Sequence, residues 1–580
     1  MLNLKYIFSA ILGFTTFSEA MAQESKTVKI RIIETSDVHG SFFPYNFIER
    51  KEAKGSMARV SSYVNSLRKE YGKNLILLDN GDILQGQPAC YYYNYVATDK
   101  QNIVSKILNY MKYDAATFGN HDIEPGHAVY DKWVKEMNCP VLGANVVSNA
   151  TGKPYTKPYA VFERDGVKVA VLGMLTPAIP NWLEEKLWSG MHFEDINLSA
   201  KKWVEYIREN EKPDVIVGLF HSGWDGGIAT PEYHEDAARS TATGVDGFDV
   251  IFFGHDHRAR KAEMKAPNGN TVLCLDPSCN AVNVADAEIT VTIKDGKVTG
   301  KAVSGEVKDI TAEPIDEAFV SHFSDDINEV KQYVDQKIGD IGETMYTKDS
   351  FFGSSPFIDL IHNLQLDITK ADVSFNAPLQ FNAVIKEGPI LMSDMFKLYK
   401  YENKLCVLRM TGEEIRRHLE MSYDLWVNTM KTKDDHIMLL DKRNSTDMQK
   451  FGFKNMTFNF DSAAGIDYVV DVTKPDGEKV KILRMTNGEK FDPKKWYRVA
   501  MNSYRANGGG ELLTKGAGIP ANELTKRKVF ESDLDLRHYL AEEIKKRGKI
   551  MPKANNNWRF VPEKWTKGAI DNDRKLLFGE

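Results

Sequence analysis

The chain contains few cysteines, and they are scattered. Only five occur in 580 residues, namely Cys90, Cys139, Cys274, Cys279 and Cys406. So few cysteines exclude a disulfide scaffold, and the absence of a CxxC pair excludes the common redox and thiolate-metal motifs. Cys274 and Cys279 are the nearest pair in sequence, so an oxidising compartment would permit a bridge there, while an odd count leaves at least one thiol free. We expect the chemistry to lie elsewhere.

A basic excess and a long apolar segment are also absent. Lys and Arg total 75 against 81 Asp and Glu, which gives a net charge of −6. Polymeric nucleic acid is bound through its phosphates by a surplus of basic side chains, so this class of partner is excluded, whereas a small phosphate compound is not. Beyond the N-terminal region no run is apolar enough to span a bilayer, and we expect no membrane span. The oligomeric state stays open.

The first 22 residues have the pattern of a secretory signal. Lys5 precedes an apolar run over residues 6–17, and Ala20-Met21-Ala22 follows as a small-residue cleavage site. The run is too short to cross a membrane, which favours a signal peptide over a buried N-terminal helix, the alternative. We therefore expect an exported protein, periplasmic or extracellular, that begins at Gln23 after cleavage.

The remaining chain is long enough for at least two domains, and its first half alternates strands and helices. Short β-rich apolar runs predict strands at 28–35, 74–79, 115–118, 167–175, 214–220 and 249–253. Helical patterns cover 58–71 and 200–211, and a hairpin with an Asp295-Gly296 turn covers 288–303. Runs that are apolar on both faces indicate an α/β fold with buried strands flanked by helices.

A polar stretch separates the two halves. Apolar side chains recur at spacings of three and four from Phe319 to Ile338, which predicts one amphipathic helix that bridges two domains. Beyond it, Thr411 to Glu414 predicts a capping box, and Asn487-Gly488 predicts a hairpin turn. We divide the chain into a signal peptide (1–22), a first domain (27–313), a linking helix (314–344), a second domain (345–562) and a tail (563–580).

Polar side chains follow the predicted strands of the first domain. The segments at these strand ends are Asp37-Val38-His39-Gly40, Asp79-Asn80-Gly81-Asp82, Gly119-Asn120-His121-Asp122, His221-Ser222-Gly223 and Gly254-His255-Asp256-His257. Open α/β sheets bind ligands at the carboxyl ends of their strands. One histidine there is commonly a surface or core residue, but the coincidence of five segments indicates a site. We interpret Asp79 as a loop cap and Arg59 as half of a structural ion pair.

Carboxylates and imidazoles together suit zinc, manganese, iron or cobalt. A carboxylate can bridge two such ions at a separation of about 3.5–4 Å, and the pair activates a shared water as a hydroxide nucleophile and binds phosphoryl oxygens. Glycines beside the ligands allow the backbone to turn sharply. The residue types therefore predict two divalent metal ions, Zn, Mn or similar.

The ordered set D-x-H, GD, GNHD, H and GHDH resembles the calcineurin-like metallophosphoesterases. Within them the chain resembles the exported nucleotidase family that includes 5′-nucleotidases and 2′,3′-cyclic-nucleotide 2′-phosphodiesterase/3′-nucleotidases, over nearly the whole mature chain. The resemblance implies a four-layer αββα sandwich, a linking helix and a smaller α/β C-terminal domain of the 5′-nucleotidase type. It also implies a nucleotide substrate and metal-dependent hydrolysis of a phosphoric ester.

The resemblance assigns roles by position. It implies that Asp37, His39 and His257 bind one metal, that Asn120, His221 and His255 bind the second, and that Asp82 bridges both. His121 takes the place of the catalytic histidine that stabilises or protonates the reacting phosphate. The usual carboxylate partner lies three residues later, at Glu124, although Asp122 is nearer in sequence.

Substrate binding is implied for Tyr401 and Tyr504, which match the two aromatic positions that sandwich the base, and for Asn376 and Asn120. Two departures separate the chain from the 5′-nucleotidase branch: the loop after Tyr504 lacks the Asp of an NGGDGF-like loop, and Asn376-Ala377-Pro378 lacks the Arg of an NGGIR-like turn. Both resemble the cyclic-phosphodiesterase/3′-nucleotidase branch.

We therefore expect an exported phosphohydrolase that acts on 2′,3′-cyclic and 3′-nucleotides. The alternative is a 5′-nucleotidase, or a nucleotide-sugar hydrolase, that releases nucleoside and phosphate. A catalytically silent nucleotide-binding protein is a different class, but it would be expected to lose ligands, and no ligand position here is apolar.

Overall fold

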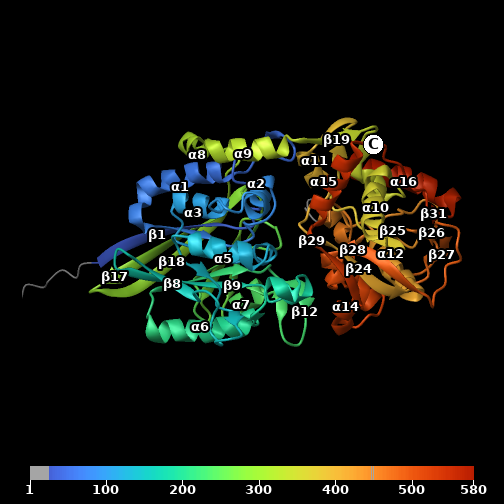
Figure 1. Ribbon diagram of the computed structural model, residues 1–580. Coiled ribbons are helices and arrows are strands. Elements are labelled where there is room, and N and C mark those ends of the chain that lie inside the picture. The colour runs from blue at the N-terminus through green and yellow to red at the C-terminus, as the bar shows by residue number, and fades with distance from the viewer. Residues whose placement is uncertain (1–24, 446, 448–449) are drawn as a thin grey trace, which may run out of the picture.

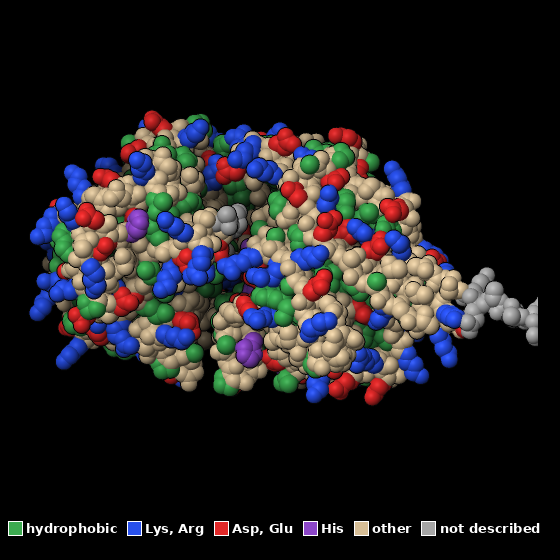
Figure 2. All heavy atoms as spheres, turned by 180° about the vertical axis from the view of Figure 1, so that it is seen from behind, with side chains coloured by type: hydrophobic (Ala, Val, Ile, Leu, Met, Phe, Trp, Pro, Cys, Tyr) green, Lys and Arg blue, Asp and Glu red, His purple; other side chains and the backbone are tan. Residues whose placement is uncertain are grey.

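The computed structural model describes residues 25–445, 447 and 450–580, so the expected signal peptide lies outside the described residues. The chain forms two lobes (Figure 1): an N-terminal lobe in blue and green, and a C-terminal lobe in yellow to red. Helices α8 (Glu317–His322) and α9 (Ser324–Val334) run along the top of the N-terminal lobe and lead into the second. Figure 2, seen from behind, shows a hollow between the lobes with Lys and Arg side chains beside it.

The N-terminal lobe contains two six-stranded sheets. The first has the order β18 (Lys297–Asp309), β17 (Asn283–Lys294), β1 (Ser25–Thr35), β4 (Leu75–Asp79), β5 (Ala115–Thr117) and β6 (Val141–Leu142). The second has the order β15 (Arg260–Lys265), β16 (Thr271–Asp276), β14 (Val250–Phe253), β11 (Val215–His221), β9 (Val167–Leu175) and β8 (Tyr159–Arg164). All six predicted strands are present, and Asp295-Gly296 forms the two-residue turn between β17 and β18, each with positive φ.

The two sheets pack face to face. Side chains such as Ile32 of β1 and Val171 of β9 belong to one buried cluster between them. Helix α1 (Met57–Tyr71) covers the outer face of the first sheet, and α6 (Ile196–Asn210) covers the second. The predicted four-layer αββα order is confirmed, because central strands such as β1 and β9 alternate side chains that face the other sheet with side chains that face a helix.

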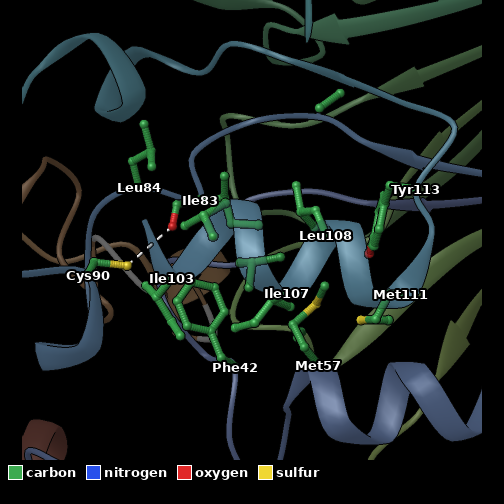
Figure 3. Close-up of a cluster of buried hydrophobic side chains, with 14 of the residues drawn as sticks. Phe42, Met57, Ile83, Leu84, Cys90, Ile103, Ile107, Leu108, Met111 and Tyr113 are labelled. Atoms are coloured by element: carbon green, nitrogen blue, oxygen red, sulfur yellow. Dashed lines mark hydrogen bonds between the residues drawn. The ribbon is translucent and has the colours of Figure 1, made fainter. Parts of the chain in front are cut away.

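Helix α3 (Ile103–Met111) completes the core on the helical side of the first sheet. Figure 3 shows Ile103 and Ile107 on the side of the helix that faces Phe42 and Met57, in the same buried cluster as Leu108. The Cys90 thiol donates to the carbonyl of Ile83 at 3.3 Å in the same cluster. All five cysteines are free, so the chemistry of the chain does not depend on a disulfide.

The predicted single linking helix is wrong in two respects. The helix breaks at Phe323, which ends α8 and precedes α9, because its φ of −98° and ψ of 15° leave the helical region. In addition, residues 337–341 form strand β19 (Lys337–Ile341), which pairs with β23 (Gly388–Leu391) of the C-terminal lobe. The buried Phe319 and Phe323 pack into the N-terminal core, so both helices belong to that lobe.

The C-terminal lobe is built on a five-stranded sheet. Its order is β25 (Ser462–Ala464), β21 (Val373–Asn376), β28 (Trp496–Asn502), β24 (Lys404–Thr411) and β29 (Lys528–Asp535). Helices α10 (Pro356–Thr369), α12 (Gly412–Trp426) and α15 (Leu536–Arg547) pack on it. The Thr411 capping box is confirmed, because Thr411 Oγ1 accepts from the Glu414 amide at 3.3 Å and Glu414 Oε2 accepts from the Thr411 amide at 2.8 Å.

One other expectation in this lobe fails. Asn487-Gly488 forms a turn in which the Met485 amide bonds the Glu489 carbonyl at 2.9 Å, but no second strand follows it to make a hairpin. The segment that we divided off as a tail contains helix α16 (Glu563–Phe578), on which the buried Asp573 accepts a hydrogen bond from the amide of Met438 at 2.8 Å.

Side chains join the two lobes directly. Gln85 Nε2 donates to Glu402 Oε2 at 2.9 Å, and Tyr91 OH donates to Asp535 Oδ2 at 2.7 Å. Ion pairs between Lys528 and Glu184 and between Lys186 and Glu531 also connect the C-terminal lobe to the N-terminal lobe. These contacts bring the ends of the N-terminal strands against the edge of the C-terminal lobe.

Candidate active site

All seven predicted metal ligands lie at one end of the N-terminal sandwich. Asp37 and His39 follow β1, Asp82 follows β4, Asn120 follows β5, and His221 is the last residue of β11. His255 and His257 follow β14. The parallel strands of both sheets therefore deliver their carboxyl ends to the same place, as parallel strand ends do in α/β folds.

The ligand atoms form two clusters that share one residue. Atoms of Asp37, His39, Asp82 and His257 lie within 4.8 Å of one another, and so do atoms of Asp82, His221 and His255. In the first, His257 Nε2 lies 3.2 Å from Asp37 Oδ1. In the second, His221 Nε2 lies 3.3 Å from Asp82 Oδ2. Asp82, which is buried, is common to both.

The seventh residue joins the second cluster. Asn120 begins the short helix α4 (Asn120–Ile123), and its Oδ1 lies 3.2 Å from His221 Nε2. The structure thus groups the residues in the two sets that the resemblance implied, with Asp82 between them.

These residues fit two divalent metal ions. Asp37 Oδ1 is buried, and the imidazole nitrogen 3.2 Å from it, His257 Nε2, is itself a candidate ligand atom, so one cation would satisfy both atoms. His221 Nδ1 bonds the Asn80 carbonyl at 2.7 Å and His39 Nδ1 bonds the Gln85 carbonyl at 3.3 Å, so the Nε2 atom of each ring remains for a ligand bond.

The charges of these side chains also suit a cation. Burial and the neighbouring imidazole of His257 lower the pKa of His39 to about 3, so its ring is neutral and keeps a lone pair at neutral pH. Burial alone would raise the pKa of Asp37, but the imidazoles of His221 and His257 outweigh it and hold that pKa well below its usual range. Without a cation, the neighbouring carboxylates also raise the pKa of His221 and raise that of His255 to about 9, so a bound divalent ion would take the place of protons on these two rings.

The backbone of the site is strained. Five of the proposed ligands have a positive φ, which residues other than glycine rarely adopt: Asp37, His39, Asp82, His255 and His257. Two glycines make room for these loops, since a Cβ at Gly119 would lie 2.1 Å from Asp82 Oδ1 and one at Gly254 would lie 2.5 Å from Asp37 Oδ2. Such outliers persist where the surrounding fold over-determines the geometry.

His121 lies beside the clusters with a carboxylate partner. Its Nδ1 is 2.6 Å from Glu124 Oε2, and its backbone amide donates to Asp82 Oδ1 at 2.8 Å. Burial would lower the pKa of His121, but the charges of Asp82 and Glu124 outweigh it and raise that pKa to about 10. A protonated imidazole can stabilise or protonate a phosphate oxygen.

Asp122, the nearer carboxylate in sequence, has a different task. Its two oxygens accept from the backbone amides of Asp82, Ile83, Leu84 and Gly119 at 2.7–2.9 Å. It therefore holds the loop that carries Asp82, and the structure pairs His121 with Glu124. Asp79 likewise caps its own turn, because its Oδ1 accepts from the Gly81 amide at 3.2 Å.

The C-terminal lobe contributes the remaining predicted side chains. The ring of Tyr401 lies parallel to that of His121, with 6.3 Å between the centroids. Tyr504 lies in helix α13 (Ser503–Ala506), with Gly509 packed against its ring. Asn376, at the end of β21, is buried, and neither its Oδ1 nor its Nδ2 has a hydrogen-bond partner.

Comparison with known families agrees with this architecture. Residues 30–259 match the model of the calcineurin-like phosphoesterases, and residues 336–515 match that of the 5′-nucleotidase C-terminal domain. The chain is a calcineurin-like phosphoesterase with a 5′-nucleotidase C-terminal domain. It is accordingly a metal-dependent phosphoester hydrolase, and the family expected from its motifs is confirmed.

Relatives of this phosphoesterase extend over both lobes. The 2′,3′-cyclic-nucleotide 2′-phosphodiesterase/3′-nucleotidase of Haemophilus influenzae is 28% identical over 96% of this chain and 91% of its own. Protein UshA of Escherichia coli is 25% identical over 86% of this chain and 89% of its own. The solved 5′-nucleotidase precursor of Thermus thermophilus shares the fold, with a TM-score of 0.63 and 20% identity over 92% of this chain and 100% of its own.

One acidic side chain of the phosphoesterase was missed by sequence reasoning. Glu235 lies on β13 (His234–Asp236), which pairs with β12 (Gly226–Ala229) in a short hairpin, and its Oε1 is 3.1 Å from His255 Nε2. The hairpin has the composition of a polar surface loop, so nothing in its residue order pointed to the site.

Over the described part of the chain, no helix has the length and apolar character needed to cross a membrane.

Proposed function

We propose that the phosphoesterase is exported and hydrolyses nucleotides, with 2′,3′-cyclic and 3′-nucleotides as its best substrates. The observation that carries the proposal is the sharing of Asp82 by two ligand clusters beside His121, since that arrangement suits two ions acting on one phosphate. Bound there, the ions would supply a hydroxide nucleophile and compensate the charge on the phosphoryl oxygens. Zinc or manganese suits these ligands.

Residues of the chain itself would guide the reaction. In our proposal one ion would be held by Asp37, His39 and His257 and the other by Asn120, His221 and His255, and both would share Asp82. Glu124 accepts a hydrogen bond from His121 Nδ1–H, which leaves Nε2–H free to donate to the phosphate or to the departing ribose oxygen. Asn120 lies near enough to the second cluster to contact the same phosphate.

Recognition of the nucleoside would fall to the C-terminal lobe. Tyr401, whose ring lies beside that of His121, and Tyr504 of α13 would offer aromatic faces to the base, and aromatic stacking on a base contributes about 1–3 kcal/mol. Asn376 supplies a buried amide with unused donors and an unused acceptor. The 2′,3′-cyclic-nucleotide 2′-phosphodiesterase/3′-nucleotidases among the relatives support this substrate class, as do the missing Asp and Arg of the 5′-nucleotidase branch.

The experiment that tests the proposal compares 2′,3′-cAMP, 3′-AMP, 5′-AMP and p-nitrophenyl phosphate with the same enzyme and an added divalent metal. We expect kcat/KM to be highest for the first two and to vanish when a chelator removes the metal. A higher kcat/KM for 5′-AMP would contradict the substrate assignment, and undiminished activity in chelator would contradict the metal mechanism.

A 5′-nucleotidase is the second candidate. UshA matches most of the chain, and the C-terminal lobe matches the 5′-nucleotidase domain model. The same comparison of substrates separates the two candidates, because both use one metal site and differ only in how the lobe orients the ribose.

A further inference from the structure

We infer that Glu235 is a positioning residue for the second metal ion, which it serves by fixing the orientation and tautomer of His255. The inference rests on the proposed dimetal site. The carboxylate itself is assigned no ligand bond.

The first support is the geometry of the ring. Glu235 Oε1 lies 3.1 Å from His255 Nε2, so a proton on Nε2 is shared with the carboxylate. Only Nδ1 of that ring then retains a lone pair for a cation. His255 also belongs to the cluster with Asp82 and His221, and a carboxylate hydrogen bonded to the distal nitrogen is the usual support of a metal-binding histidine.

The second support is that Glu235 is itself held firmly. Its Oε2 accepts from the amide of Ile228 at 2.6 Å, and its carbonyl accepts from Ser222 Oγ at 2.7 Å and Thr176 Oγ1 at 3.0 Å. The side chain is only 13% exposed. Because both its carboxylate and its backbone carbonyl are held by hydrogen bonds, Glu235 can fix the orientation of the His255 ring.

The ring of His255 is confined on other sides as well. Its backbone amide donates to Asp37 Oδ2 at 3.0 Å, and the indole of Trp182 lies 5.7 Å from it, centroid to centroid. Asp236, the other acid near this ring, is 4.0 Å from Nε2 and accepts from the Gly223 amide at 3.0 Å. Glu235 is therefore the partner that decides which nitrogen faces the metal cluster.

The test measures metal affinity in the full chain. Metal-free wild type, Glu235→Ala and Glu235→Gln would be titrated with Zn²⁺ against a competing chelator, and the number of bound ions and their dissociation constants compared. We expect Glu235→Ala to weaken one of the two ions by about 10–100-fold and to leave the other unchanged. Glu235→Gln should weaken it less, since the amide oxygen still accepts from Nε2–H.

Glu232→Ala is the matched control, because Glu232 lies on the same hairpin but is exposed. We expect it to bind both ions as the wild type does. Unchanged affinity in Glu235→Ala would overturn the inference. An equal loss in Glu235→Ala and Glu235→Gln would overturn it too, because it would make the carboxylate a direct ligand.

The result remains decisive if Glu235→Ala fails to fold, because Glu235→Gln preserves the shape of the side chain. Selective ¹⁵N-histidine NMR on the zinc-loaded wild type then gives the tautomer, and a proton on Nδ1 of His255 rather than Nε2 would contradict the inference. A wild type that binds fewer than two ions would instead refute the proposed dimetal site itself.

Discussion

The rings of His121 and Tyr401 lie parallel, with 3° between their planes and 6.3 Å between their centroids, although they come from different lobes. His121 lies beside the proposed metal ligands, and Tyr401 is one of the two tyrosines proposed to stack on the base of the substrate. The proposed catalytic residue of the N-terminal lobe and a proposed base-stacking residue of the C-terminal lobe are therefore neighbours across the boundary between the lobes.

Tyr401→Ala should raise KM for nucleotides by roughly 5–150-fold, the equivalent of about 1–3 kcal/mol of stacking, and should leave p-nitrophenyl phosphate hydrolysis near the wild-type rate. Steady-state kinetics on both substrates measure the difference. Tyr346→Ala removes an exposed tyrosine of the same lobe and is the control. An equal loss on both substrates would assign Tyr401 to the reaction rather than to the base.

Asp82→Asn should lower the content of both metals and reduce turnover more than His39→Ala does. The reason is that one carboxylate is shared by both clusters, so its charge is lost to two ions at once. Elemental analysis of the purified variants gives the metal content. Two ions fully retained in Asp82→Asn would refute the bridging role.

His121→Ala should keep both metals and lower kcat by about 10²–10⁴-fold, the range for loss of a general acid or base. Glu124→Gln should have a smaller effect in the same direction, since it weakens the hydrogen bond that directs the ring. Metal analysis together with kcat distinguishes the roles. Loss of metal from His121→Ala would make His121 a ligand.

A chain that ends after residue 335 should fold and hydrolyse p-nitrophenyl phosphate, whereas one that ends after residue 313 should be much less stable. The shorter chain lacks Phe319 and Phe323, both fully buried in the N-terminal core. Losing a buried Phe side chain costs about 3–5 kcal/mol, and the sum rivals the whole stability of a domain. Urea unfolding compares the two, and equal midpoints would contradict the assignment of α8 and α9 to this lobe.

Acid should destabilise the fold partly through His362. The ring lies between Ser374 Oγ and Ser462 Oγ, at 2.9 and 3.1 Å, and burial lowers its pKa from 6.5 to about 3. Between about pH 6.5 and about pH 3, this histidine is protonated in the unfolded chain but neutral in the folded chain. The free energy of unfolding therefore falls as the pH falls through this window, by about 1.4 kcal/mol per pH unit.

His362→Gln should therefore lose less free energy of unfolding than the wild type between pH 7 and pH 5, by roughly 2 kcal/mol at pH 5. Urea unfolding in chelator at both pH values measures this, with the exposed His192→Gln as the control. Parallel declines in wild type and His362→Gln would contradict the buried neutral state.

Much of the site was predictable because it depends on strand ends. Apolar β-rich runs located β1, β4, β5, β11 and β14, and the residue types after them suited metals. The family resemblance supplied the grouping, which residue types alone leave open. The sequence could also indicate Glu124, because three residues of helix bring its side chain back to His121.

Other features depend on contacts between distant segments. Glu235 reaches His255 only because the β12–β13 hairpin folds back beside the loop that follows β14. The division of the strands into two sheets is decided by packing, since either arrangement buries the same apolar runs. The break at Phe323 has no Gly or Pro to mark it, and it occurs in a pattern that continues with helical spacing.

The left-handed backbone at five proposed ligands has a consequence for tolerance to mutation. Each such residue costs on the order of 1–2 kcal/mol relative to an ordinary conformation, so the loops are kept in place by free energy drawn from the packed sheets. Mildly destabilising substitutions far from the site, within the sandwich, could therefore let the ligand loops relax while the rest of the lobe stays folded. Activity would then decline at temperatures where secondary structure is still intact.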